Sequence, residues 1–154
     1  MSIDQLVDFL NTYDPGSDTE ELPDDAAARA WFAARGLAAE GLAAAEARQV
    51  RTELRDAAEG RTPPTAALRH VPLCACVEDG ELVLTSGHPL GPLVATAVRL
   101  AFEGRWDRLK LCDAETCRYA FYDGSRNRSG RWCSMASCGN RAKTRAFRER
   151  HRSG

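Results

Sequence analysis

The sequence predicts an α+β protein: a predominantly helical N-terminal domain with a β-hairpin, followed by a small cysteine-rich module. Three observations support this fold class. Apolar residues recur at helical period in several segments before residue 103. The dipeptide Asp79-Gly80 separates two segments that alternate in character. Four of the six cysteines lie between residues 112 and 138, and 154 residues suffice for one domain and a small module.

The N-terminal segment predicts a short helix. Ser2 and Gln5 form a capping-box pattern, and apolar residues follow at helical spacing as far as residue 10. The same segment also allows a strand over Leu6–Leu10. The sequence Asp14-Pro-Gly16 ends this element, and we expect residues 17–22 to form a loop.

Two more helices are predicted before the hairpin. Asp24 or Asp25 can cap a helix that runs through Ala33 and ends at Gly36. Apolar residues at helical period, with charged residues on the other side, predict a longer amphipathic helix over residues 38–59.

A β-hairpin is predicted over residues 71–85. Asp79-Gly80 is typical of a two-residue type I′ turn, and the flanking segments 71–77 and 81–85 read as strands. Cys74 and Cys76 fall on one face of the first strand, where they could bind a soft metal or react together. Because no histidine or basic residue adjoins them, we favour buried thiols that fill a core.

A helix over residues 89–102 and a short strand over residues 106–111 lead into the cysteine-rich module. The helix has a broad apolar face, and Gly104 ends it. The strand delivers the first cysteine of the module. We therefore divide the chain into an N-terminal domain, residues 1–104, and a C-terminal module, residues 105–154.

The cysteines of the module form two C-x4-C pairs, Cys112 with Cys117 and Cys133 with Cys138. Two thiol pairs separated by a hairpin-length segment converge into the tetrahedral environment that a structural Zn²⁺ prefers. Two disulfides are the alternative. No secretory signal precedes the first helix, so we expect a cytoplasmic, reducing location in which disulfides are disfavoured. The predicted cofactor is one zinc ion bound by all four cysteines.

The surrounding residues predict a treble-clef-like zinc finger. Residues 118–122 alternate as a strand, Asp123-Gly124 indicates a turn, and Cys138-Gly139 opens a strongly helical segment. The expected order is a cysteine knuckle, a hairpin and a helix that begins at the last ligand. Such a module is too small to fold by apolar burial alone, so it depends on the metal.

The C-terminal part of the chain resembles the CGNR zinc finger, through the motifs Cys138-Gly-Asn-Arg141, Arg131-Trp-Cys-Ser-Met135 and Phe121-Tyr-Asp-Gly-Ser-Arg-Asn127. That module typically ends bacterial proteins whose N-terminal part is the ABATE domain, described as stress-induced transcription regulators. Three further segments are similar to this family more loosely: Leu6-Val-Asp-Phe-Leu-Asn-Thr12, Leu73-Cys-Ala-Cys-Val77 and Asp107-Arg-Leu-Lys-Leu-Cys112. The resemblance implies the fold and a regulatory role.

Charge is divided unevenly along the chain. Residues 1–103 contain 8 Lys+Arg and 17 Asp+Glu, a net charge of −9, whereas residues 104–154 contain 13 and 5, a net charge of +8. This asymmetry indicates an acidic body with a basic end that binds polyanions.

Nine basic residues and one acidic residue lie between positions 126 and 152. Positions 141, 145, 148 and 152 share one stripe of the predicted last helix, and Phe147 is expected to face the core of the finger. The charge could be a solvated face that offsets the zinc site or docks on the acidic body, or it could be a nucleic-acid interface. It exceeds what one zinc site requires, so we favour a nucleic-acid interface of Arg126, Arg128, Arg131, Arg141, Lys143, Arg145, Arg148 and Arg152.

Other polar and aromatic residues of the module could also touch nucleic acid. For four short polar residues we favour turn capping and orientation of the cysteines: Asp123, Ser125, Asn127 and Asn140. Four aromatic residues could stack bases, but we favour a small core over the metal for some of them: Tyr119, Phe121, Tyr122 and Trp132. The histidines have no obvious partners, and we expect surface or capping roles for His70, His88 and His151.

We expect a DNA-binding transcriptional regulator whose zinc is structural. Base contacts would come from Arg141, Lys143 or Arg145, near the start of the last helix. The alternative is a zinc-stabilised interaction module that binds RNA or an acidic protein partner. No nucleophile–base motif or phosphate-binding glycine loop is present, so we expect no enzyme. The N-terminal domain could bind a small-molecule effector. No segment is apolar enough to span a membrane. The oligomeric state is open.

Overall fold

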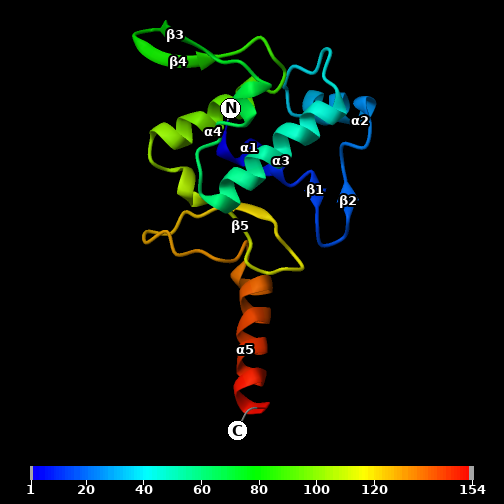
Figure 1. Cartoon of the computed structure of the whole chain (residues 1–154), viewed down its shortest axis with the longest axis vertical. Helices are drawn as coiled ribbons and strands as arrows, with labels where there is room; N and C mark the ends of the chain where they lie inside the picture. The colour runs from blue at the N-terminus through cyan, green and yellow to red at the C-terminus, as the bar shows by residue number, and fades with distance from the viewer. Residues whose placement is uncertain (1, 153–154) are drawn as a thin grey trace.

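The computed structural model describes residues 2–152, apart from the side chain of Arg152, and it confirms the α+β fold class (Figure 1). The strands form three separate antiparallel pairs: β1 with β2, β3 with β4, and β5 with β6. In chain order the elements are α1 (Ile3–Leu10), β1 (Tyr13–Asp14), β2 (Thr19–Glu20), α2 (Asp25–Ala33), α3 (Ala44–Gly60), β3 (Cys74–Glu78), β4 (Glu81–Thr85), α4 (Gly91–Phe102), β5 (Leu109–Leu111), β6 (Ala120–Tyr122) and α5 (Asn140–Arg152).

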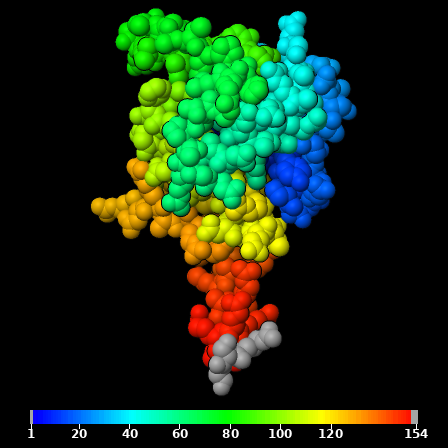
Figure 2. All heavy atoms as spheres, in the orientation of Figure 1, coloured from blue at the N-terminus to red at the C-terminus, as the bar shows by residue number. Residues whose placement is uncertain are grey.

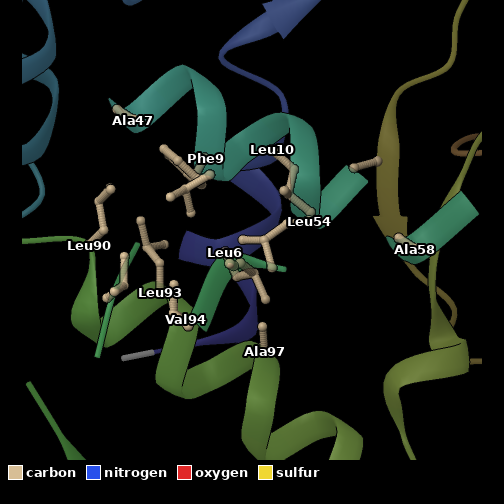
Figure 3. Packing of buried hydrophobic residues seen from close by; sticks show 14 of the residues in the cluster. Leu6, Phe9, Leu10, Ala47, Leu54, Ala58, Leu90, Leu93, Val94 and Ala97 are labelled. Carbon is tan, nitrogen blue, oxygen red and sulfur yellow. The ribbon is translucent and has the colours of Figure 1, made fainter. Parts of the chain in front are cut away.

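The core of the body forms where α1 packs against α3 and α4 (Figure 3). The capping box predicted the helix correctly: Ser2 Oγ accepts from the backbone N–H of Gln5, and Gln5 Oε1 accepts from that of Ser2. The helix buries Leu6, Phe9 and Leu10 on one side. A strand would have turned Phe9 to the face opposite Leu6 and Leu10, so helical spacing suits this core better.

Helix α3 begins at Ala44, six residues after the start that periodicity predicted. Gly36 and Gly41 adopt left-handed backbone angles, with φ of 68° and 71°, and this interrupts the chain between α2 and α3. The cap of α3 comes from outside the helix, because the carboxylate of Asp25 accepts a hydrogen bond of 2.8 Å from the backbone N–H of Ala44. Asp24 caps α2, as predicted.

The expected loop over residues 17–22 contains a strand, β2, which pairs with β1. An ion pair between the buried Arg51 and the half-buried Glu20 holds this small hairpin against α3. Arg51 donates to Glu20 at 2.7 and 2.5 Å and to the hydroxyl of Thr12 at 2.8 Å. Burial alone would raise the pKa of Glu20, but the hydrogen bonds from Arg51 and from the backbone of Leu22 hold it below its ordinary value. Because each strand has only two residues, no periodicity in the sequence could indicate it.

The hairpin of β3 and β4 has the predicted turn. Glu78 pairs with Glu81, and the two residues between them, Asp79 and Gly80, have φ of 51° and 83°, as a type I′ turn requires. The hairpin projects from the body (Figure 1), so the thiol of Cys74 is exposed and that of Cys76 is half-buried. The expectation that both thiols fill a core is therefore wrong.

The buried core continues past residue 104 into the C-terminal module. A 3-10 turn, Trp106–Arg108, replaces the first half of the strand expected over residues 106–111, and β5 forms the second half. Leu109, Leu111 and Ala120 from β5 and β6 are buried in the same cluster as the helices. A division of the chain at residue 104 remains a prediction, and any such division would cut through one continuous core.

Candidate metal centre and basic helix

The sulfur atoms of Cys112, Cys117, Cys133 and Cys138 all lie within 4.8 Å of one another. The Cys117 and Cys133 sulfurs are 3.6 Å apart, and those of Cys133 and Cys138 are 3.8 Å apart. A tetrahedral ion with Zn–S bonds of about 2.3 Å requires sulfur–sulfur separations of about 3.8 Å. These separations are far longer than the roughly 2.05 Å of a disulfide. The cluster therefore fits a four-coordinate zinc ion.

The first cysteine pair lies at the tip of the β5–β6 hairpin. Cys112 directly follows β5, and its N–H donates to the carbonyl of Tyr119 at 2.8 Å. The turn that holds Cys117 closes with a hydrogen bond of 2.8 Å from the Cys117 N–H to the carbonyl of Ala114. We expected the hairpin to follow the knuckle, but the knuckle connects the two strands of the hairpin. The reason is that Leu111 pairs with Ala120 and both are buried.

The motif around the last cysteine has a structural role at each position. A Cβ on Gly139 would lie 2.8 Å from the sulfur of Met135, so a side chain there would require Met135 to move. Asn140 donates through Nδ2 to the carbonyl of Ala136 at 3.3 Å and begins α5. Arg141 donates through Nη2 to the sulfur of Cys138 at 3.4 Å. These contacts hold Cys138 in a wide turn directly before α5.

The thiols differ in their affinity for protons. Burial raises the pKa of Cys117 and of Cys133. Burial also acts on Cys138, but hydrogen bonds from the other thiols and from Arg141 outweigh it and lower the pKa of Cys138 to about 7. A metal ion would therefore bind with release of protons from most of the cluster, as metal ions at thiolate sites do.

Asp123 organises the loop between the two cysteine pairs. Its carboxylate is 4% exposed, and it accepts from Lys110 Nζ at 2.7 Å and from the backbone N–H groups of Ser125 and Gly130 at 3.0 and 2.7 Å. Burial would raise the pKa of Asp123, but these hydrogen bonds hold it well below its usual range. All of these partners belong to the module itself, which supports the prediction that Asp123 caps a turn instead of contacting nucleic acid.

Two of the three predicted basic residues in this loop already have acidic partners. Arg128 donates to both carboxylate oxygens of Asp107, at 2.9 and 2.8 Å, and Arg131 donates to Asp113 at 2.7 Å. Exposed ion pairs of this kind contribute at most about 1 kcal/mol, so a phosphate could exchange with the carboxylate. Arg126 is exposed and forms no ion pair within the described residues.

Helix α5 stands clear of the body (Figure 2), and its main contact is with the turn Met135–Gly139. The predicted Arg141, Lys143, Arg145 and Arg148 are all exposed on it, and a groove lined by Arg141, Arg145 and Arg148 runs along one side. Arg152 belongs to α5, but its side chain lies outside the described residues. Phe147 is 55% exposed, so the expectation that it faces the core of the finger is wrong. The reason is that α5 extends away from the finger after its first turn.

Three polar side chains that sequence analysis missed join the module to the body. The side chain of Asn11, at the end of α1, donates to the carbonyl of Ala120 at 2.9 Å and accepts from the Ala120 N–H at 2.7 Å. Arg55 of α3 donates to the carbonyls of Leu10 and Arg118, at 2.8 Å each. Glu59 forms an ion pair with the side chain of Arg118. In the sequence Asn11 looked like an ordinary helix end, and no signal connected it to Ala120.

Family models match nearly the whole chain. The ABATE model, whose description is "Putative stress-induced transcription regulator", matches residues 4–111, and the CGNR zinc finger model matches residues 108–151. The two matches overlap over residues 108–111, which include β5 and end directly before Cys112. Comparison with curated proteins gave no match. Among residues 2–152, no helix combines the length and the apolar character that a membrane span requires.

Proposed function

Because the chain belongs to the ABATE family and carries a CGNR zinc finger, we propose that it is a cytoplasmic regulator of transcription that binds double-stranded DNA through its C-terminal module. The family's description supports a role in transcription, and its reference to stress supports action under stress. The observation that carries the DNA contact is α5, an exposed helix with six basic residues and one acidic residue, a net charge of +5.

The zinc ion in this proposal is structural. Cys112, Cys117, Cys133 and Cys138 would hold it, and with four protein ligands no position is open for a substrate. The ion would fix the turn Met135–Gly139 and thereby the direction in which α5 leaves the module. The families that match the chain are regulatory and zinc-finger families, which agrees with the absence of a catalytic motif.

The basic residues would neutralise phosphates. On α5 these are Arg141, Lys143, Arg145, Arg148 and Arg152, and the loop adds Arg126, Arg128 and Arg131. The acidic body, with its net charge of −9 over residues 1–103, would oppose DNA except where the module projects. A groove between β4 and α4, lined by Leu82, Ala95, Thr96 and Arg99 among others, offers the body a place for a small-molecule effector.

A selection from random double-stranded DNA, with RNA in competition, tests this function on the zinc-loaded chain. We expect a preferred duplex to be recovered. The logarithm of affinity should then fall with the logarithm of salt concentration, by about 0.9 for each phosphate neutralised. Arg148→Ala should flatten that slope by about one unit. Arg69→Ala, which removes an exposed arginine from the body, is the matched control and should change nothing.

Three outcomes would contradict the proposal. Binding whose strength is independent of salt would exclude phosphate neutralisation as its basis. Recovery of RNA in preference to DNA, or of no sequence at all, would favour the alternative, a zinc-stabilised module that binds RNA or an acidic protein.

A further inference from the structure

We infer that α5 lies within the major groove of DNA, with positive charge toward both walls, and that Phe147 and His151 face the base edges. This inference rests on the proposed function and specifies its partner and the reading face. It comes from the arrangement of side chains around α5, which projects from the rest of the molecule (Figures 1 and 2).

Positive charge lies on two opposite sides of the helix. Successive residues of an α-helix are separated by about 100°. Arg141, Arg145 and Arg148 therefore share one side, and Lys143 and Arg150 share another. The mean directions of these two groups differ by about 180° at that spacing. All five side chains are exposed.

The two remaining sides of α5 differ in chemistry. On one, Thr144, Phe147 and His151 lie between the two basic groups. The rings of Phe147 and His151 are 4.2 Å apart, and Phe147 is 55% exposed. The opposite side carries Ala142, Ala146 and Glu149, the one acidic residue of α5. Packing within the described chain does not account for an exposed aromatic pair on so polar a helix, whereas a partner that covers it would.

Positive charge on opposite sides favours a groove over a flat surface. A helix that lies on an acidic protein surface needs basic residues on the contacting side only. In the DNA major groove the phosphates form two walls, and the groove, about 12 Å wide, admits an α-helix about 10–12 Å across. The major groove of double-stranded RNA is too narrow for side chains to read the bases. The charge distribution of α5 therefore matches DNA best.

The face between the basic groups would then point to the floor of the groove. An aromatic ring such as Phe147 makes apolar contact with the thymine methyl group, and an imidazole such as His151 can donate to a purine N7 acceptor. The sequence predicted base contacts from Arg141, Lys143 or Arg145. The guanidinium of Arg141 donates to the Cys138 sulfur, and Lys143 and Arg145 lie in the two basic groups. The reading face accordingly lies further along the helix than the residues next to the zinc site.

The test compares the zinc-loaded full chain on its selected duplex with the same chain on a scrambled duplex. Phe147→Ala should lower affinity for the selected duplex about tenfold and leave affinity for the scrambled duplex nearly unchanged. Replacing the contacted thymine by uracil removes only the methyl group, and it should weaken the wild type but not Phe147→Ala. Ala146→Ser, on the opposite side of α5, is the control and should keep full discrimination. Zinc content confirms that each variant is folded.

A second pair of variants tests the two walls. Lys143→Ala and Arg148→Ala, on opposite sides, should each weaken binding to both duplexes and flatten the salt dependence by about one unit. If Lys143→Ala has no effect, the helix lies on a surface and the groove arrangement is wrong. An equal loss on both duplexes for Phe147→Ala, or no effect of uracil, would overturn the reading face while DNA binding itself stands. If the wild type binds neither duplex, the inference and the proposed function both fail.

Discussion

Arg141 acts on the metal cluster through a single sulfur atom. A zinc ion with four thiolates carries a net charge of −2, and the hydrogen bond from Arg141 to Cys138 offsets part of it. Outer-shell partners of this kind also orient the ligand. Arg141 thus serves the metal site in addition to contributing to the basic side of α5.

We therefore expect Arg141→Ala to weaken zinc binding by about 10- to 100-fold, as loss of an outer-shell partner typically does. Competition with a chelator of known affinity measures this change. Arg145→Ala, one turn further along, makes no contact with the cluster and should bind zinc as the wild type does. Equal zinc affinity in both variants would show that Arg141 has no role at the site.

The six cysteines should separate into two groups by reactivity. Cys74 and Cys76 lie on the projecting hairpin, whereas the other four would be coordinated as thiolates. Brief alkylation of the zinc-loaded protein, followed by mass spectrometry, should modify only the hairpin pair, and chelation should expose the other four.

Cys133→Ser provides the complementary measurement, because loss of one ligand should release the zinc. The three remaining thiols of the cluster should then react as fast as the hairpin pair. Rapid alkylation of Cys112 or Cys138 in zinc-loaded wild type would contradict the assignment of ligands.

At the scale of elements, α5 is a helix whose main contact within the described residues is with the turn Met135–Gly139 directly before it. It has 13 residues, and isolated helices shorter than about 12–15 residues are marginal in water. Like charges also face each other along it, at spacings of three and four residues among Arg141, Arg145 and Arg148, and each such pair is unfavourable by about 0.2–0.5 kcal/mol. A polyanion would remove that repulsion.

Helicity of α5 should therefore rise when a duplex binds. Far-ultraviolet circular dichroism of the zinc-loaded chain should show a stronger helical signal after DNA is added, and a smaller gain in high salt without DNA, because salt screens the like charges. A chain that ends at Thr144 is the control and should show neither gain. An unchanged signal in the full chain would mean that α5 is already fully formed.

At the scale of the whole molecule, α3 connects the N-terminal hairpin, α1 and the zinc module. Arg51, Arg55 and Glu59 follow one another at four-residue spacing on one side of α3. They bind the β1–β2 hairpin, the end of α1 and the zinc module respectively. Together with the core shared by β5, β6 and the helices, these contacts make the position of the zinc module depend on the body.

Asn11→Ala tests that dependence. It leaves the buried N–H and carbonyl of Ala120 without partners, at a cost of about 1–3 kcal/mol for each group. Urea unfolding should show lower stability, and zinc affinity should fall as well, because binding of zinc is linked to folding of the site. Asn127→Ala, in the exposed loop, should change neither. A stability loss with unchanged zinc affinity would show that the body and the module are independent.

The sequence by itself determined the features that depend on neighbours along the chain. The capping box of Ser2 and Gln5, the turn at Asp79-Gly80 and the two cysteine pairs each involve residues within a few positions of one another, and each has the local structure that its pattern predicts. The CGNR motif is also local in this sense. Its four residues are consecutive, and Asn140 and Arg141 contact residues of the adjoining turn, Ala136 and Cys138.

Only the tertiary structure decided which surfaces are covered. Periodicity shows that Phe147 and Cys74 lie on a particular face, but whether another element packs on that face depends on distant parts of the chain. Within residues 2–152 both side chains are exposed. The start of α3 depends on Asp25, 19 residues before Ala44. The position of the zinc module against the body depends on Asn11, 109 residues before Ala120. Such contacts form only when the chain has folded. Side-chain hydrogen bonds between distant residues leave no periodic pattern in the sequence, so the sequence alone did not indicate them.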